Sequence, residues 1–379
     1  MILTDTQELV RDTARNFARD RIAPHTRAWE AARSVPDEVF AEMGALGFLG
    51  MTVPESLGGA GLDYVSYALA LMEVAAGDGA LSTIMSVNNA PVCAILVNRG
   101  SPEQQQRFLR PLAAGQAIGA FALTEPQAGS DASALRTRAT RAPGGYRLNG
   151  VKQFITSGCI AKVAITFAVT DPDAGKRGIS AFLVPTETPG FRVSSVEHKL
   201  GQEASDTAQL TYEDVFVEEG LRIGAEGDGY RIALSNLETG RIGIGAQSVG
   251  MAEAALAYAT GYAKERRAFG KTLSEHQAVL FRLADMATQV AAARELVLAA
   301  AALQDAGRPC LKEACMAKLF ASEAAEKVAS AALQVLGGYG YVRDYPIEKI
   351  YRDVRVCQIY EGTSDVQRMV IGRELLAAS

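Results

Sequence analysis

The feature that most restricts the fold of this chain is the separation of helical and strand periodicity into three blocks. Apolar residues recur at helical spacing over about 4–112, and again from about 229 onward. Over 119–217 the chain instead carries short runs of β-branched and aromatic residues, separated by turn clusters such as 143–145 and 171–173. Strands gathered in one block, without long crossover helices, predict an α+β protein whose β domain is mainly antiparallel.

These blocks give three predicted domains, at residues 1–118, 119–227 and 228–379. The first is α-helical, the second is a compact, barrel-like β domain, and the third is a helical bundle. The predicted bundle helices cover 230–264, 274–306 and 311–336, and a last one begins near Thr363. A chain of 379 residues is long enough for such a division and for a sizeable buried ligand.

Charge and composition remove several classes of protein. The net charge is −5, and no block of Lys and Arg marks a surface for nucleic acid. The N-terminal stretch has charges throughout and no apolar core of a secretory signal, and no run of eighteen uncharged apolar residues predicts a membrane span. We therefore expect a cytoplasmic protein with neither a nucleic-acid partner nor a membrane span.

Cysteine and histidine usage predicts no metal site. The five cysteines are scattered and odd in number, without CxxC spacing, which argues against both a disulfide framework and a zinc site. The three histidines, His25, His198 and His276, are widely dispersed. No GxGxxG follows a predicted strand, and no P-loop, GxSxG or HExxH occurs, so a dinucleotide site of the Rossmann type and most hydrolase mechanisms are disfavoured.

Three polar, glycine-containing segments lie near domain transitions or between predicted helices. Residues 121–131 could bring backbone N–H groups to a phosphate, but a plain turn explains them equally well. In residues 152–158, Phe154 is by type more often a core residue than a ring platform. Residues 265–277 place Arg266 and Arg267 between two helices, where they could clasp phosphate or form a solvated charge cluster. Ser274 and Gln277 also match a helix capping box.

The fourth segment, residues 358–367, is the most informative. It reads QIYEGTSDVQ, which places the carboxylate of Glu361 on a loop directly before a predicted helix. Without further context Glu361 would be an ordinary surface acid.

Together these segments resemble the acyl-CoA dehydrogenase family over essentially the whole chain. The motifs ALTEPQAGSD, FITSG, ERRAFGKTLSEHQ, QVLGGYGYVRDYPIEKIYRD and QIYEGTSDVQR occur in the order and at the intervals of that family. The resemblance implies an N-terminal helical domain, a middle β domain and a C-terminal four-helix bundle. It also implies FAD as the cofactor and a homotetramer, a dimer of dimers.

The resemblance assigns cofactor contacts to two groups of residues. The first would meet the flavin ring and pyrophosphate of the same subunit: Phe121, Ala122, Leu123, Thr124, Ser130, Phe154, Ile155 and Thr156. The second would reach the FAD of a neighbouring subunit: Arg266, Phe269, Gln277, Gln334, Gly337 and Gly338. Thr363 and Ser364 would meet the dinucleotide half.

On the substrate side, the resemblance implies contacts from Ser130, Glu238, Arg241 and Gly362, with Glu238 where the family often has Asp. Glu361 matches the base that removes the C2 proton of a fatty acyl-CoA thioester. Some branches supply this carboxylate from the position just before the arginine, which here is Gly240 and cannot act as a base.

The implied activity is the FAD-dependent dehydrogenation of a short-chain acyl-CoA to the trans-2-enoyl-CoA, with electron-transfer flavoprotein as the electron acceptor. The stretches at 86–89, 198–201 and 240–244 resemble the short-chain, butyryl-type branch, whereas 337–340 also resembles branched-chain members. Branched-chain or medium-chain substrates remain an alternative, as does a flavin oxidase or monooxygenase on an acyl thioester. A flavin-binding scaffold without turnover, related to DNA-associated members, would need a basic face that this acidic chain lacks.

Overall fold

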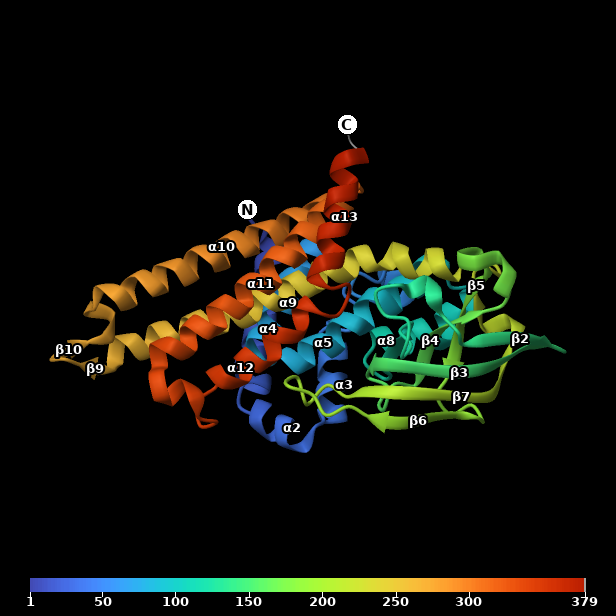
Figure 1. Ribbon diagram of the computed structural model, residues 1–379, viewed down its shortest axis with the longest axis horizontal. Helices are drawn as coiled ribbons and strands as arrows, with labels where there is room; N and C mark the ends of the chain where they lie inside the picture. Colours follow the sequence, from blue (N-terminus) through green and yellow to red (C-terminus); the bar gives the residue numbers. More distant parts are fainter. Residues whose placement is uncertain (378–379) are drawn as a thin grey trace.

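The computed structural model describes residues 1–377, apart from the side chains of residues 237 and 238. Helices form both ends of the chain and a sheet forms its middle, so the predicted α+β fold is confirmed (Figure 1). The exact domain boundaries stay predictions.

The N-terminal part is helical, and polar side chains mark where its helices begin. Thr4 and Gln7 form a capping box at the start of the first helix, and Asp63 accepts a hydrogen bond from Ser66 N at the start of the fourth. The helices are α1 (Asp5–Phe17), α2 (Thr26–Ala32), α3 (Asp37–Ala45), α4 (Tyr64–Gly77), α5 (Gly79–Val87), α6 (Ala94–Arg99), α7 (Pro102–Gln104) and α8 (Arg110–Ala113).

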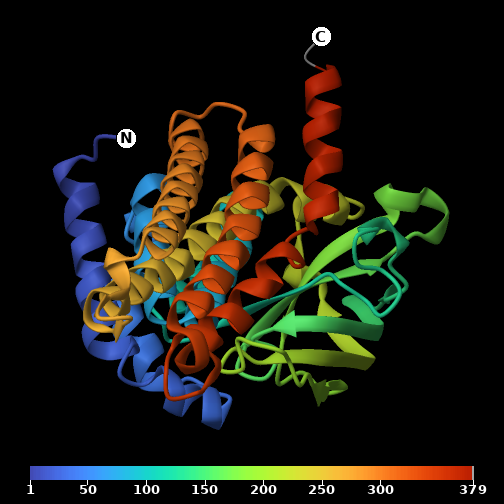
Figure 2. The same ribbon diagram turned by 60° about the vertical axis from the view of Figure 1, so that its left-hand side comes forward.

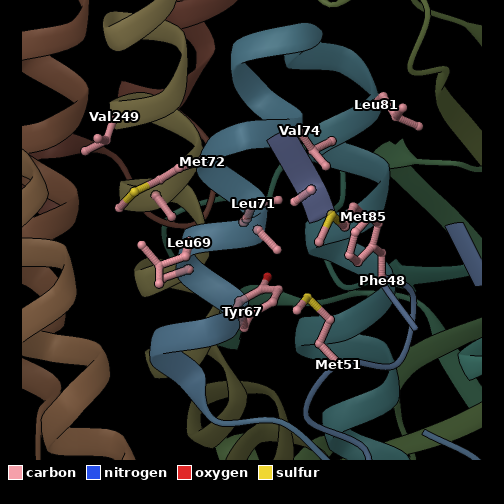
Figure 3. Close-up of a cluster of buried hydrophobic side chains, with 14 of the residues drawn as sticks. Phe48, Met51, Tyr67, Leu69, Leu71, Met72, Val74, Leu81, Met85 and Val249 are labelled. Atoms are coloured by element: carbon pink, nitrogen blue, oxygen red, sulfur yellow. The ribbon is translucent and has the colours of Figure 1, made fainter. Parts of the chain in front are cut away.

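Helix α4 is the centre of the core. It is buried on all sides because it packs against α1, α9 (Gly229–Glu265) and α10 (Gln277–Asp305). Its side chains Tyr67, Leu69 and Met72 lie among residues from the neighbouring elements (Figure 3). The crossing with α9 is close, since a Cβ at Gly250 would lie 2.0 Å from the carbonyl oxygen of Met72. Glycine at this position lets the two backbones touch.

The middle part is one sheet with the strand order β6-β7-β3-β2-β4-β5-β8. Its strands are β1 (Gly119–Ala122), β2 (Arg138–Ala142), β3 (Gly145–Thr156), β4 (Val163–Val169), β5 (Ile179–Pro185), β6 (Phe191–Val196), β7 (Thr207–Glu218) and β8 (Arg222–Ile223). Most pairs are antiparallel, as predicted. However, β1 runs parallel to β4, and β2 meets β4 in parallel at Arg138 and Val169, so the sheet is mixed.

The C-terminal part contains the long helices α9, α10 and α11 (Leu311–Leu336), followed by α12 (Ile347–Val354) and α13 (Ser364–Ala377). Helix α9 is continuous over 37 residues. It runs from the sheet to a small hairpin, β9 (Arg267–Ala268) and β10 (Lys271–Thr272), at the far end of the molecule (Figure 1). In both views α13 projects from the body of the protein (Figure 2).

One predicted helix start is wrong. The capping box lies at Thr272 and Glu275, which close a short 3-10 turn, rather than at Ser274 and Gln277. Helix α10 then begins at Gln277 after His276, which provides no side-chain cap. The pattern S-x-x-Q was correct in spacing, but the neighbouring T-x-x-E is the one that the chain uses.

A buried ion cluster joins the three parts of the chain. Lys349 Nζ lies 3.0 Å from Asp78 Oδ2 and 2.6 Å from Asp353 Oδ2, and all three side chains are buried. Asp78 also accepts a hydrogen bond from Thr26, and Asp353 accepts one from the backbone N–H of Gln202. The cluster thereby ties α2, α5 and α12 to the loop after β6.

Two helical stretches, Gly79–Arg99 and Gln277–Asp305, are long and apolar enough to cross a membrane by length and composition alone. The first is 89% buried inside the protein, as expected for a core helix. The second is 39% buried and carries exposed apolar residues such as Leu280 and Phe281. Within the described residues, no group of three or more His, Cys, Asp or Glu side chains is placed to hold a metal ion.

Candidate active site

Glu361 lies between the 3-10 turn at Arg355–Gln358 and the start of α13. Its backbone is left-handed, with φ of 54°, and that of Gly362 follows with φ of 87°. Glu361 Oε2 is buried without a hydrogen-bond partner. Burial raises the pKa of Glu361 to about 7, although the charges of Arg241 and Lys318 oppose this rise. This carboxyl group is therefore a base near neutral pH, with an oxygen left for an incoming proton.

The unusual backbone at Glu361 is held by two buried side chains. Gln367 Nε2 donates to the carbonyl oxygens of Glu361 at 3.1 Å and Gly362 at 2.8 Å. Lys318 Nζ on α11 donates to the same Gly362 carbonyl at 2.7 Å. A Cβ at Gly362 would lie 2.8 Å from Gln367 Nε2, so a side chain there would push this support away. Gly362 is therefore needed for its backbone, whatever ligand it contacts.

Helix α9 forms the wall opposite the carboxylate. Arg241 is buried, and its Nε has no hydrogen-bond partner among the described atoms. A Cβ at Gly240 would lie 2.8 Å from Glu361 Oε2, so the alternative base position that the resemblance implies lies directly beside Glu361. Glu238 belongs to α9, but its side chain lies outside what the structure describes.

A buried polar network lies next to Glu361. Tyr360 donates its hydroxyl hydrogen to Gln247 Oε1, and Gln247 Nε2 donates to Gly79 O and Ser82 Oγ, each at 2.8 Å. Thr83 Oγ1 also donates to Gln202 Oε1 at 2.6 Å. Sequence reasoning missed this network, because the only sign of it was a glutamine inside an otherwise apolar stretch of α9.

The sheet contributes a second set of predicted site residues. Phe154 stands on β3 with φ of 57° and 62% of its surface exposed, which suits a ring platform rather than a core position. Phe121 is half-buried against Phe167, with ring centroids 5.1 Å apart. Ile155 is 2% exposed and packs into the sheet core, so only its backbone can face a ligand. The structure leaves Ala122 and Leu123 buried, Thr124 and Thr156 half-buried, and Ser130 exposed.

A buried ion pair fixes these two segments to each other, and it too was missed. Lys152 Nζ lies 2.8 Å from Glu125 Oε1 and donates to Leu123 O at 3.0 Å. Burial tends to raise the pKa of Glu125, but the charge and hydrogen bond of Lys152 bring it down to about 2. Burial lowers the pKa of Lys152 to about 8 against the pull of Glu125. Gln153 N also donates to Thr124 O at 2.9 Å, so residues 121–125 and 152–156 form one unit.

Thr363 and Ser364 lie at the start of α13, directly after Gly362; Thr363 Oγ1 accepts a hydrogen bond from Val366 N, and Ser364 Oγ is buried without a partner among the described atoms. The predicted residues of the second group lie at the hairpin end, far from the sheet (Figure 1). Arg266 stands over the ring of Tyr339, 5.4 Å from its centroid, beside a cleft of about 470 Å³. Gly337 and Gly338 line this cleft, and nothing lies within 4 Å of a Cβ built on either. Phe269 is 97% exposed at the hairpin tip. Gln277, at the start of α10, and Gln334, near the end of α11, are also exposed. The structure thus places the predicted residues in three groups: the two sheet segments, the hairpin end, and the turn around Glu361 with Arg241.

Family models match nearly the whole chain. The N-terminal, middle and C-terminal domains of acyl-CoA dehydrogenase match residues 4–116, 120–215 and 227–376. The chain therefore belongs to the acyl-CoA dehydrogenase family, and it is an oxidoreductase enzyme.

The chain is also similar over nearly its full length to individual acyl-CoA dehydrogenases. The chain is 48% identical over 379 residues to an acyl-CoA dehydrogenase of Bacillus subtilis, which it covers completely. It is 45% identical over 374 residues to the human mitochondrial short-chain specific acyl-CoA dehydrogenase, with 99% of this chain and 91% of that one covered.

Solved structures agree with these relatives. Butyryl-CoA dehydrogenase from Megasphaera elsdenii superposes with a TM-score of 0.96 at 41% identity over 99% of both chains. A chain in a structure of the electron transferring flavoprotein of Acidaminococcus fermentans gives a TM-score of 0.98 at 44% identity, again over 99% of both chains. A glutaryl-CoA dehydrogenase from Mycobacterium smegmatis in complex with FADH2 gives 0.94 at 34% identity, over 99% of this chain and 95% of that one.

FAD is the cofactor of this family and of this chain. The residues present fit such a group. The exposed ring of Phe154 offers a surface for a flat heterocycle, and the exposed Gly129 leaves open space where a phosphate could approach the backbone.

Proposed function

We propose that this enzyme oxidises a short-chain acyl-CoA to the trans-2-enoyl-CoA, and that Glu361 is the base that removes the C2 proton. The observation that carries this proposal is the buried carboxylate of Glu361, with a pKa raised to about 7 and an oxygen that has no partner. A carboxyl group of ordinary pKa would be a weaker base toward a carbon acid, so burial improves Glu361 for this step.

The chemistry divides between the protein and its cofactor. The C2–H bond breaks as the proton passes to a Glu361 oxygen, its electron pair forms the C2–C3 double bond, and the C3–H bond breaks as hydride leaves. FAD, when bound, supplies the acceptor for that hydride. The chain holds the base in place through Gln367 and Lys318, and Oε2 of the carboxylate is buried against the backbone of Gly240 on α9. By resemblance, the backbone N–H of Glu361 donates to the thioester oxygen as negative charge develops there.

A short acyl chain is supported by the relatives' names and by the packing beside the base. One turn beyond Gly240, a Cβ at Gly243 would lie 2.8 Å from Ser86 Oγ and 2.9 Å from Tyr67 OH. One turn further along α9, the hydrogen bonds from Gln247 to Gly79 and Ser82 join this helix to α5 and leave little space between them. This close packing favours a short straight chain over a long one.

The two groups of cofactor residues support a shared site between subunits. Residues 121–124, 130 and 154–156 would hold FAD from the same subunit, with Thr363 and Ser364 on its dinucleotide half. The hairpin residues Arg266 and Phe269, with Gln277 and Gln334–Gly338, would reach the FAD of a neighbour. These two groups lie at opposite ends of the molecule, which favours a site completed by a second subunit, in keeping with the homotetramer that the resemblance implies (Figure 1).

The substrate side and the electron acceptor complete the proposal. Arg241, Gly362, Ser130 and Glu238 would contact the acyl-CoA. Electron-transfer flavoprotein would take the electrons, and the similarity to a chain solved in a structure of such a flavoprotein supports this acceptor.

The test is an anaerobic titration of the purified yellow protein with butyryl-, isobutyryl-, isovaleryl-, octanoyl- and palmitoyl-CoA, with flavin bleaching as the signal. Butyryl-CoA should bleach the wild type, and Glu361→Gln should bind butyryl-CoA without bleaching. Bleaching by a branched or eight-carbon thioester alone would replace the substrate assignment. Rapid hydrogen peroxide formation in air would instead favour the oxidase alternative.

A further inference from the structure

Lys318 is a buried cation next to the proposed base. It lies in the middle of α11 with none of its surface exposed, and its Nζ donates to Gly362 O at 2.7 Å. Among the described side chains, no carboxylate lies within ion-pair distance of this nitrogen. The nearest charged and titratable groups are Glu361, Arg241, Cys357 and Cys315.

Such a lysine is costly to the fold. An ammonium group removed from water without a paired carboxylate loses much of its favourable solvation. The cost shows in the titration, since burial lowers the pKa of Lys318 to about 8. A methionine of similar length would fill the same space without this penalty. The position therefore points to a task that needs a charge or a donor.

Among the described residues, the ammonium donates one hydrogen bond, and it leads to the turn that carries the base. Gly362 O belongs to the residue directly after Glu361, and both residues have left-handed backbones. A left-handed conformation at a residue with a side chain is strained, so surrounding contacts must hold it. Gln367 supplies neutral hydrogen bonds to this turn, whereas Lys318 adds a positive charge.

We propose that Lys318 is a positioning residue for the base: its ammonium fixes the Glu361–Gly362 turn, and its charge favours the carboxylate form of Glu361. This inference rests on the proposed function, in which Glu361 removes the proton. Lys318 reaches Glu361 through the Gly362 carbonyl and through its field, and it needs no contact with the substrate.

Other charged or titratable groups also lie near Glu361 and influence its pKa. Arg241 on α9 is the second cation, and Tyr67 on α4 is a buried hydroxyl whose proton is held more tightly because of burial and of Glu361. Tyr360 and Cys357 lie on the same segment as Glu361. Removal of Lys318 leaves Arg241 as the only cation acting on the carboxylate among the described groups, so the acid form becomes more favourable.

The experiment compares Lys318→Met and Lys318→Arg with wild type in the FAD-loaded protein. The matched control is Lys327→Met, an exposed lysine on the same helix. Stopped-flow reduction by butyryl-CoA gives the rate constant and the substrate Kd at each pH. The pKa of Glu361 is read independently from its carboxylate infrared band, as the difference between each protein and the same protein with Glu361→Gln.

Lys318→Met should lower the reduction rate constant about tenfold or more, while the substrate Kd changes less than about threefold, because a small displacement of a reacting group has a large effect on rate. The Glu361 pKa should move upward in both the infrared and the pH-rate profile. Lys318→Arg keeps the charge and should return the pKa toward wild type. Lys327→Met should match wild type in every reading.

The inference would be overturned if a folded Lys318→Met protein kept the wild-type Glu361 pKa and the wild-type reduction rate constant. It would also be overturned if only the affinity for the substrate fell. If Lys318→Met fails to fold, Lys318→Gln, which keeps a neutral donor, decides the matter, since its Glu361 pKa must lie above that of wild type. If wild type itself is not reduced by butyryl-CoA, the proposed substrate is wrong. The infrared comparison then still tests the action of Lys318 on Glu361.

Discussion

The backbone of Gly240 faces the carboxylate of Glu361 so closely that a Cβ built on this glycine would lie 2.8 Å from Glu361 Oε2. By the resemblance, these are the two positions from which members of the family supply the base. In this chain one of them must lack a side chain so that the other can hold its orientation.

Gly240→Ala should therefore impair the reaction more than the fold. The added methyl group would push the Glu361 carboxylate aside, and we expect the reduction rate constant to fall about tenfold to a hundredfold. Gly261→Ala on the same helix is the control, because nothing lies within 4 Å of its added Cβ. This control should keep its rate and gain about 0.5–1 kcal/mol of stability. Equal rates in the two variants would contradict the geometry.

The raised pKa of Glu361 predicts how activity and stability depend on pH. Since the base must be ionised, the rate of flavin reduction at saturating substrate should rise with pH through about 7 and then level off. The stability of the folded protein changes in the opposite direction and falls as the pH rises. The folded protein holds this proton more tightly than the unfolded chain, so ionisation costs stability between about 4.5 and 7.

Glu361→Gln removes that cost. The melting temperature of the variant relative to wild type should increase as the pH rises through this window and should stay constant above it. A difference that is flat from pH 4.5 to 8 would show that the carboxylate is ionised at its ordinary pKa.

The buried pair of Lys152 and Glu125 should be sensitive to the loss of one partner. Lys152→Met leaves Glu125 buried without its cation, and we expect a loss of about 3–5 kcal/mol in the free energy of unfolding. The double variant Lys152→Met/Glu125→Gln should lose less, which a double-mutant cycle in urea would measure. Arg192→Met, in the exposed pair of Arg192 and Glu213, should change stability by less than about 0.5 kcal/mol. If Lys152→Met were as stable as wild type, water would have to solvate Glu125, and the pair would not be buried in solution.

Phe269 at the hairpin tip should matter for cofactor retention rather than for folding of the subunit. Its side chain is 97% exposed and meets only the ring of His276 edge-on, with centroids 6.1 Å apart, so Phe269→Ala removes little packing among the described residues. We expect a lower ratio of FAD to protein after gel filtration, with unchanged helical content. The control is Tyr341→Ala, because Tyr341 is 89% exposed in the turn that follows α11. This control should keep its flavin. Full flavin content in Phe269→Ala would argue against a site shared between subunits.

The elements with strong periodicity were predictable from the sequence. The observed bounds of α9 and α11 lie within one residue of the prediction, and α13 begins at Ser364 instead of Thr363. These helices were clear because their apolar residues repeat at 3.6-residue spacing over many turns. The placement of Glu361 before a helix start was also correct, since Gly-Thr-Ser is a local signal.

Features that depend on distant partners could not be predicted in this way. The parallel pairing of β1 with β4 joins residues 119–122 to 163–166, and nothing local in either strand specifies it. Lys152 and Lys318 stand in sequence as ordinary lysines, and only the folded chain shows that both are buried. Burial of a charge is decided by what packs over it, and that is a property of the tertiary structure.

The continuity of α9 restricts how this protein can change over time. Each residue of an α-helix adds about 1.5 Å of length and about 100° of rotation. One residue inserted between Arg241 and Arg266 would turn the hairpin away from its present direction unless the helix took up the extra residue in a π-type turn, as at Ala18–Ile22. Substitutions can accumulate along this stretch, but insertions and deletions disturb the protein less elsewhere, for example in the loop between α10 and α11. The number of residues in α9 should thus be inherited more strictly than their identity.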